Sequence, residues 1–183
     1  MIQNSLKQQA EEFARKAHEH IILVATTGMK WPQIIHLEEV ARLVTESGGS
    51  EAEIAAAWLH DTVEDTSVTL DDIENEFNKD VRELVGGLTD LDEFKDLPLV
   101  ERKRKQAERV KSESVGVRRI KLADQTSNVR RMTQHGNAAW TPEEHVIYIH
   151  GAKLIADQCR GISDFLDQLF KENYQKAGKM YGF

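Results

Sequence analysis

The sequence SEAEIAAAWLHDTVEDT, residues 50–66, sets the pattern of the whole chain. Ser50 followed three residues later by Glu53 is the capping box that begins a helix, so we expect one helix through the segment. At about 100° per residue, one histidine and three carboxylates of this helix lie within an arc of roughly 140°, and an apolar face lies opposite. The acidic face consists of His60, Asp61, Glu64 and Asp65. Because clustered negative charges are unfavourable alone, a cation or a basic partner is expected against this face.

Helical periodicity continues on both sides of this segment, and we predict an all-α fold. No strand alternation, hairpin turn or internal repeat is evident in the sequence. Gly-Gly at residues 48–49 and 86–87 is interpreted as a pair of helix stops. The helices are expected at residues 4–24, from Trp31-Pro32 to Ser47, at 69–77, 81–88, 98–111, 116–132 and 141–161, and through Phe170, followed by a loose tail.

Length and composition predict one domain over residues 1–183, with its core at about 8–172. The net charge of −7 argues against a nucleic-acid-binding protein. The longest aliphatic run, residues 21–25, is too short to span a bilayer, and no basic and apolar leader opens the chain. With Cys159 as the single cysteine, a reducing cytoplasmic location is expected. Oligomeric state cannot be read from the sequence.

Charge is unevenly distributed between two consecutive segments. Residues 51–98 hold fifteen acids against three bases, and residues 99–131 hold eleven bases against four acids. The two segments could simply neutralise each other across the fold. Alternatively, a metal binds the acidic segment while the basic segment faces an anionic substrate.

Three separated places could meet at the acidic cluster: His36, the pair His60-Asp61, and Asp124. Two imidazoles and two carboxylates form a nitrogen and oxygen donor set that suits manganese, iron, cobalt or zinc better than calcium. Water bound to such an ion loses a proton more easily, and Glu64 and Asp65, one turn beyond the pair, could take that proton or orient the attacking water.

Each of these residues also has an ordinary structural interpretation. A histidine on a helix, such as His36, is more often a partly buried structural residue. Asp124 could be a helix cap or a salt-bridge partner of Lys121 or Arg131. The residues alone leave both interpretations open.

Two longer motifs carry a resemblance to a known family. HDTVEDT, followed after ten residues by FNKDVRELVGGLTDL, resembles the hydrolase segment of the RelA/SpoT family. KLADQTSNVRRM, residues 121–132, resembles that family's second signature, and His36 stands where its first metal histidine belongs. LVERKRKQAERV, the spacing from Trp140 to Tyr148 and the overall length are most similar to the small stand-alone, metazoan-type alarmone hydrolases.

The resemblance implies a helical HD-domain phosphohydrolase that removes pyrophosphate from the 3′ position of ppGpp or pppGpp. It also implies a nucleotide substrate and one divalent metal, usually manganese. The implied metal ligands are His36, His60, Asp61 and Asp124; Glu64 and Asp65 activate water; Asn128 and Tyr148 contact the substrate.

Several positions depart from the family pattern. Ala25-Thr26 stand where a basic pair is usual, Gln33 replaces a tyrosine, Leu99 a lysine, and Gln125 a basic residue. Because these positions usually contact phosphates or base, a different nucleotide or phosphate ester stays an alternative substrate. A non-catalytic nucleotide-sensing protein is a second alternative.

The remaining cationic and histidine residues have less specific interpretations. Lys95 or the run at residues 102–105 could supply replacement cations, although such a run is usually a solvated helix face. His18 and His20 are expected to be solvated, and Cys159 is expected to be buried.

Overall fold

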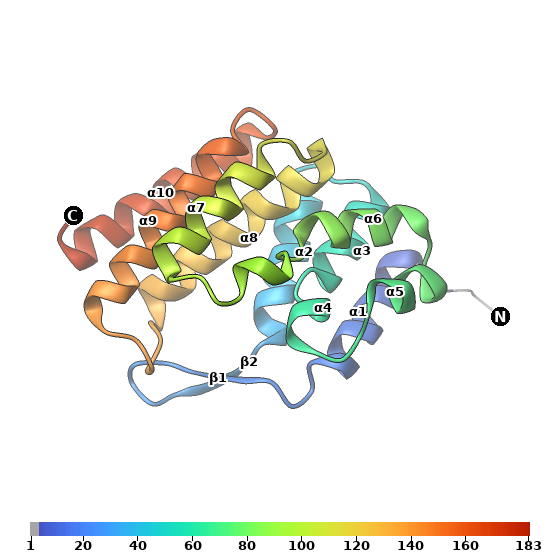
Figure 1. The fold of residues 1–183 in the computed structure, drawn as a ribbon, viewed down its shortest axis with the longest axis horizontal. Coiled ribbons are helices and arrows are strands. Elements are labelled where there is room, and N and C mark those ends of the chain that lie inside the picture. Colours follow the sequence, from blue (N-terminus) through green and yellow to red (C-terminus); the bar gives the residue numbers. More distant parts are fainter. Residues whose placement is uncertain (1–3) are drawn as a thin grey trace.

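The structure, a computed structural model, describes residues 4–183 as a helical bundle with one short hairpin (Figure 1). The long helix α8 crosses the middle of the bundle and packs against α2, α9 and α10. The elements are α1 Leu6–Ala17, β1 Ile22–Val24, β2 Lys30–Pro32, α2 Ile34–Glu46, α3 Glu51–Leu59, α4 Thr62–Asp65, α5 Leu70–Glu76, α6 Lys79–Leu88, the 3-10 helix η1 Asp92–Phe94, α7 Leu99–Val110, α8 Val115–Gln134, α9 Pro142–Gln158 and α10 Asp164–Tyr181.

The predicted all-α class is confirmed, and helix starts follow the capping signals in the sequence. Ser50, Thr69 and Thr141 each accept a hydrogen bond from the backbone N–H three residues later. The acidic residue at that third position bonds back to the backbone of the cap, which satisfies two otherwise free donors at each helix start. No helix within residues 4–183 is long and apolar enough to cross a membrane.

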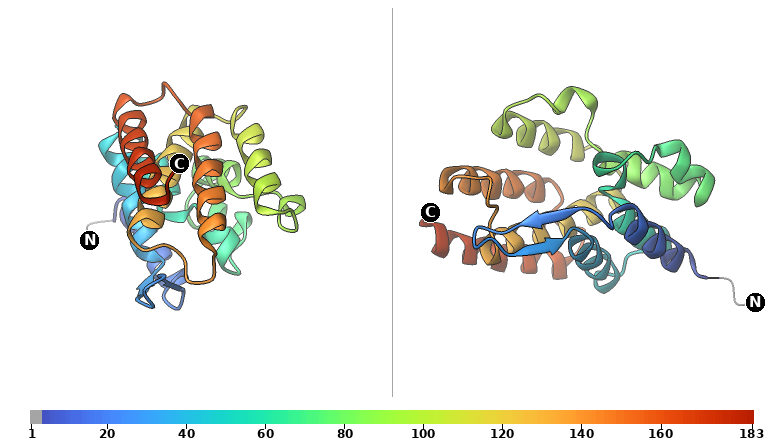
Figure 2. Two further views of the ribbon diagram at one scale, coloured as in Figure 1. Left: turned by 90° about the vertical axis from the view of Figure 1, so that its left-hand side faces the viewer. Right: turned by 90° about the horizontal axis from the view of Figure 1, so that it is seen from below.

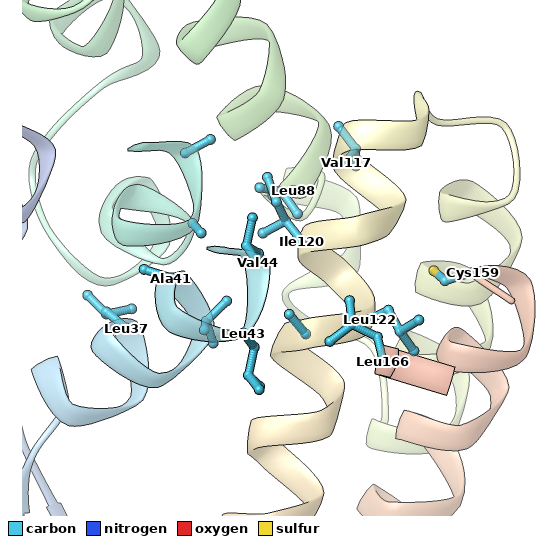
Figure 3. Close-up of a cluster of buried hydrophobic side chains, with 14 of the residues drawn as sticks. Leu37, Ala41, Leu43, Val44, Leu88, Val117, Ile120, Leu122, Cys159 and Leu166 are labelled. Carbon is cyan, nitrogen blue, oxygen red and sulfur yellow. The ribbon is translucent and has the colours of Figure 1, made fainter. Parts of the chain in front are cut away.

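The core lies between α2, α3 and α8, whose apolar faces are almost fully buried. Burial of each large aliphatic side chain contributes about 1.5–3 kcal/mol. This packing holds fixed the three helices that carry the polar centre described below. Figure 3 shows Val44 of α2 beside Leu88 and Ile120, and Leu122 beside Leu166 on the other side of α8.

The helix predicted for residues 4–24 is wrong after Ala17. α1 ends at Ala17, and residues 22–24 pair antiparallel with residues 30–32. A β-branched and aliphatic run suits a strand, and Gly28 takes the positive φ of +81° that its tight turn requires. Pro32 therefore ends a strand, and α2 begins two residues later than Pro32. The hairpin runs along one face of the bundle, seen from below in Figure 2.

The helix predicted over residues 50–66 is interrupted. α3 ends at Leu59 and α4 begins at Thr62, with the His60-Asp61 pair at the junction. Neighbouring residues of a regular helix point about 100° apart. Both residues keep right-handed helical dihedral angles, and their side chains still reach one centre, since an Asp61 oxygen lies 3.3 Å from His60 Nε2.

Two further expectations are wrong. The tail is not loose, since α10 continues to Tyr181, whose hydroxyl donates to the Met132 carbonyl at 2.8 Å. His18 is fully buried rather than solvated, with Nδ1 3.0 Å from the Ala14 carbonyl. His20 is exposed and Cys159 is buried, as expected. The first three residues of the predicted domain lie outside the described residues.

Candidate functional site

Three parts of the bundle bring histidine and carboxylate side chains to one point. His36 lies on α2, His60 and Asp61 at the α3–α4 junction, and Asp124 on α8. The Nε2 atoms of His36 and His60 are 3.2 Å apart, and an Asp124 oxygen lies 3.3 Å from the first and 3.8 Å from the second. An Asp61 oxygen lies 3.3 Å from His60 Nε2, and the other lies 3.8 Å from His36 Nε2. The ligand atoms of His36, His60 and Asp124 all lie within 4.8 Å of one another.

Hydrogen bonds fix the tautomer of both imidazoles. His60 Nδ1 donates to the Ala57 carbonyl at 2.8 Å. Ser127 Oγ donates to Glu39 at 2.6 Å, so it accepts from His36 Nδ1 at 2.9 Å. In the neutral form both Nε2 atoms therefore carry lone pairs directed at the same point, an arrangement that a shared cation stabilises.

Amide side chains hold the two aspartates. Gln33 donates to Asp61 Oδ2 at 2.9 Å, and Gln125 donates to Asp124 Oδ2 at 2.7 Å. Asn128 donates to Asp124 Oδ1 at 2.5 Å. Because a carboxylate only accepts hydrogen bonds, each amide NH₂ must face its aspartate.

The electrostatics of the centre favour a positive occupant. Burial opposes ionisation of Asp124, but the Lys121 ammonium 3.6 Å away and the two imidazoles together outweigh it, and the pKa of Asp124 is lowered. Burial also opposes protonation of His60, but Asp61 and Asp124 outweigh it and raise the pKa of His60. The metal-free protein thus attracts a proton to the place where the donor set fits a divalent ion.

Glu64 and Asp65 extend the acidic wall one turn beyond the pair. Burial is the main cause that raises the pKa of Glu64, whose Oε1 accepts from the Asp90 N–H at 2.7 Å. Burial, with the charges of Asp61 and Glu64, raises the pKa of Asp65 to about 7. A carboxyl group with such a pKa can exchange a proton near neutral pH.

The centre opens into a cavity of about 320 Å³ with both charge signs on its walls. Four carboxylates line it, and so do the cations Lys103, Lys121 and Arg131. The rings of Trp140 and Tyr148, with centroids 4.9 Å apart, form an aromatic border. A cavity with this lining suits a phosphorylated ligand that carries an aromatic or sugar group.

The structure brings the predicted site residues together. His36, Asp61, Glu64, Asp65, Asp124, Asn128 and Tyr148 line the cavity, and His60 contacts three of them from behind. Lys95 does not line it, because its ammonium pairs with Asp92 at the surface. Of the basic run at 102–105, only Lys103 reaches the cavity.

The sequence did not identify the residues that orient the proposed ligands, and of the cavity's cations it indicated only Lys103, as one member of the run at residues 102–105. Ser127 and Glu39 lie on different helices; Ser127 is part of the 121–132 motif, but no role is implied for it there, and Glu39 belongs to no motif. Of the family departures, Gln33 and Gln125 hold the aspartates, whereas Thr26 Oγ1 donates to the His135 carbonyl at 3.0 Å. For Gln125 the sequence did contain a signal, because a polar residue next to Asp124 can donate a hydrogen bond to its carboxylate.

Comparisons with known proteins agree with this geometry. The HD domain family model matches residues 10–150. The guanosine-3′,5′-bis(diphosphate) 3′-pyrophosphohydrolases MESH1 of Mus musculus and Homo sapiens are each 34% identical over 172 residues, 93% of this chain and of theirs. A solved structure described as a metazoan ortholog of SpoT that hydrolyzes ppGpp superimposes with a TM-score of 0.85 and 29% identity, over 97% of this chain and 98% of that one.

Proposed function

The chain belongs to the HD domain family, and we propose that it is a metal-dependent phosphohydrolase that removes pyrophosphate from the 3′ position of ppGpp. The observation that carries the proposal is the meeting of His36, His60 and Asp124 at one wall of a cavity that also holds cations. The ligand set, with Asp61 as its fourth member, and the roles below are part of the proposal.

Manganese is the proposed ion, since two imidazoles and two carboxylates suit it and balance its charge. When bound, a divalent ion supplies Lewis acidity and lowers the pKa of a coordinated water. His36, His60, Asp61 and Asp124 would hold the ion and would leave part of its coordination shell free for water.

The acidic pair is assigned the proton transfer. Asp65, assisted by Glu64, accepts a proton from the attacking water, and the resulting hydroxide attacks the phosphorus of the 3′ ester. The bond from that phosphorus to the 3′ oxygen breaks, the 3′ oxygen acquires a proton, and GDP and pyrophosphate leave. Asn128 and Tyr148, which line the cavity, are assigned contacts with the nucleotide.

The test is a panel of substrates with purified protein and manganese. Pyrophosphate release from ppGpp, faster than phosphate or pyrophosphate release from other nucleotides, is expected. Faster turnover of another nucleotide or phosphate ester would replace the substrate while leaving the reaction class. Binding of nucleotides without turnover of any would contradict the enzyme and favour a nucleotide-sensing protein.

A further inference from the structure

Of the three cations that line the cavity, Lys121 is already neutralised. Its ammonium lies 3.6 Å from the Asp124 carboxylate, and Asp124, Glu64 and other acids outweigh burial to raise the pKa of Lys121. The positive charge of Lys121 is therefore balanced by carboxylates of the protein itself. Lys103 and Arg131 differ, because within residues 4–183 neither side chain has a carboxylate at salt-bridge distance.

Lys103 reaches the cavity through a narrow space beside Gly151, called the slot below, which its aliphatic stem fills. The residue is only 6% exposed, although lysine is almost never buried without a partner. Its aliphatic stem passes Gly151 of α9, where a Cβ atom would lie 2.5 Å from Lys103 Cγ. Its ammonium lies 4.3 Å from the centre of the Tyr148 ring. Burial lowers the pKa of Lys103 to about 8, so the group still carries its charge at neutral pH.

Arg131 approaches the cavity from the C-terminal half of α8. One of its NH₂ groups donates to Asn128 Oδ1 at 3.1 Å, and its buried Nε has no hydrogen-bond partner among the described residues. A guanidinium presents its donors in a planar fork that matches phosphate oxygens. An incompletely used fork on a cavity wall is therefore suited to an anionic ligand.

We propose that Lys103 and Arg131, which line the same cavity as Tyr148, bind a phosphate group of the substrate while the proposed metal ligands hold the reacting centre. The inference rests on the proposed function for its substrate, a nucleotide with a diphosphate group. Neither residue acts as an acid or base in it. Both lower the free energy of the bound anion by direct charge-assisted hydrogen bonds.

The expected effect is on anion affinity. Replacing Lys103 by Met keeps a stem of similar shape in the slot beside Gly151, and Arg131→Gln keeps a polar group beside Asn128. Loss of a charge-assisted hydrogen bond is expected to weaken binding roughly tenfold or more. Arg104→Gln is the matched control, because Arg104 is exposed on the same helix and pairs with Glu101 and Glu108.

The experiment has two readouts on manganese-loaded protein: KM and kcat for ppGpp, and the Kd for inorganic pyrophosphate by calorimetry. We expect Lys103→Met and Arg131→Gln to raise KM and Kd, with manganese affinity unchanged and Arg104→Gln like wild type. Values within twofold of wild type for both variants would overturn the inference, as would a loss confined to manganese affinity.

The two proposals fail in different ways. If wild type bound pyrophosphate but released none from ppGpp, the proposed function would fail, and the pyrophosphate Kd of the variants would still test Lys103 and Arg131. If wild type bound no pyrophosphate at millimolar concentration, the inference would be wrong whatever the substrate.

Discussion

At the scale of single residues, the site depends on hydrogen bonds that orient the proposed ligands. The series of hydrogen bonds from His36 through Ser127 to Glu39 fixes Nδ1 of the His36 imidazole as a donor. It leaves Nε2 of the same ring free to bind an ion. Glu39 is itself held by Arg130. Such outer partners commonly determine metal affinity by a factor of about 10–100.

Ser127→Ala is expected to weaken manganese binding roughly 10–100-fold, because His36 loses the acceptor that sets its tautomer. Ser112→Ala is the matched control, since Ser112 is exposed and bonds only to the Arg109 carbonyl. Manganese titration by calorimetry measures both variants. Equal affinity in Ser127→Ala and wild type would show that the relay does not orient the ligand.

Asp65→Asn is expected to reduce kcat by roughly 10²–10⁴-fold, the usual contribution of a positioned general base. Bound manganese should stay near one ion per chain, because Asp65 is outside the proposed ligand set. Steady-state kinetics with elemental analysis of the same samples checks both. A variant with wild-type kcat would remove Asp65 from the proton transfer.

The same residue predicts a pH dependence of stability. The pKa of Asp65 is about 7 in the folded, metal-free protein and about 4 in an unfolded chain. Its stabilising contribution is therefore complete below about pH 4 and is lost as the pH rises through 7. We expect the wild-type Tm to fall between about pH 6 and about pH 8 more than that of Asp65→Asn, measured by calorimetry without metal. Identical pH dependence in the two proteins would contradict the assigned pKa.

At the scale of elements, the sequence predicted the helices with strong caps and missed features that depend on packing. Ser50, Thr69 and Thr141 marked helix starts that the structure confirms. The hairpin was missed because its strands have only three residues each, too few to display an alternation. The interruption after Leu59 was missed because no glycine or proline marks it.

The candidate site was predictable only in part, because some of its residues depend on packing between helices. Motif residues such as His60 and Asp124 could be identified by resemblance. Lys103 could be indicated only as one member of the basic run at residues 102–105, and the roles of Ser127 and Arg131 could not be indicated at all, because these roles arise from contacts between helices that no local pattern encodes. The slot between α7 and α9 is one example, since it needs Gly151 and Lys103, 48 positions apart, to face each other.

Gly151→Ala tests that contact between elements. A Cβ 2.5 Å from Lys103 Cγ must displace the lysine stem, and such overpacking costs about 1–3 kcal/mol. Lower stability and weaker pyrophosphate binding are expected together. Gly86→Ala on α6 is the control, because its Cβ would meet Leu70 at an ordinary 3.5 Å, and alanine favours a helix. Denaturant unfolding that ranked Gly151→Ala at or above wild type would contradict the slot.

At the scale of the whole molecule, the bundle sets positive and negative charge against each other across one cavity. The acidic segment supplies Asp61, Glu64 and Asp65, and the basic segment supplies Lys103 and Arg131. Other charges of the two segments neutralise each other away from the cavity, as Arg119 and Glu53 do at 3.5 Å. Neutralisation between the two segments is therefore found away from the cavity, while binding of a metal and an anionic substrate at the cavity stays a prediction.

The central claim is that His36, His60, Asp61 and Asp124 bind one divalent ion. Anomalous diffraction at the manganese absorption edge, from crystals grown with manganese, tests it most directly. The account predicts one strong anomalous peak at bonding distance from both Nε2 atoms and from a carboxylate oxygen of each aspartate. An empty centre at saturating manganese, or a peak bonded to other residues, would contradict it.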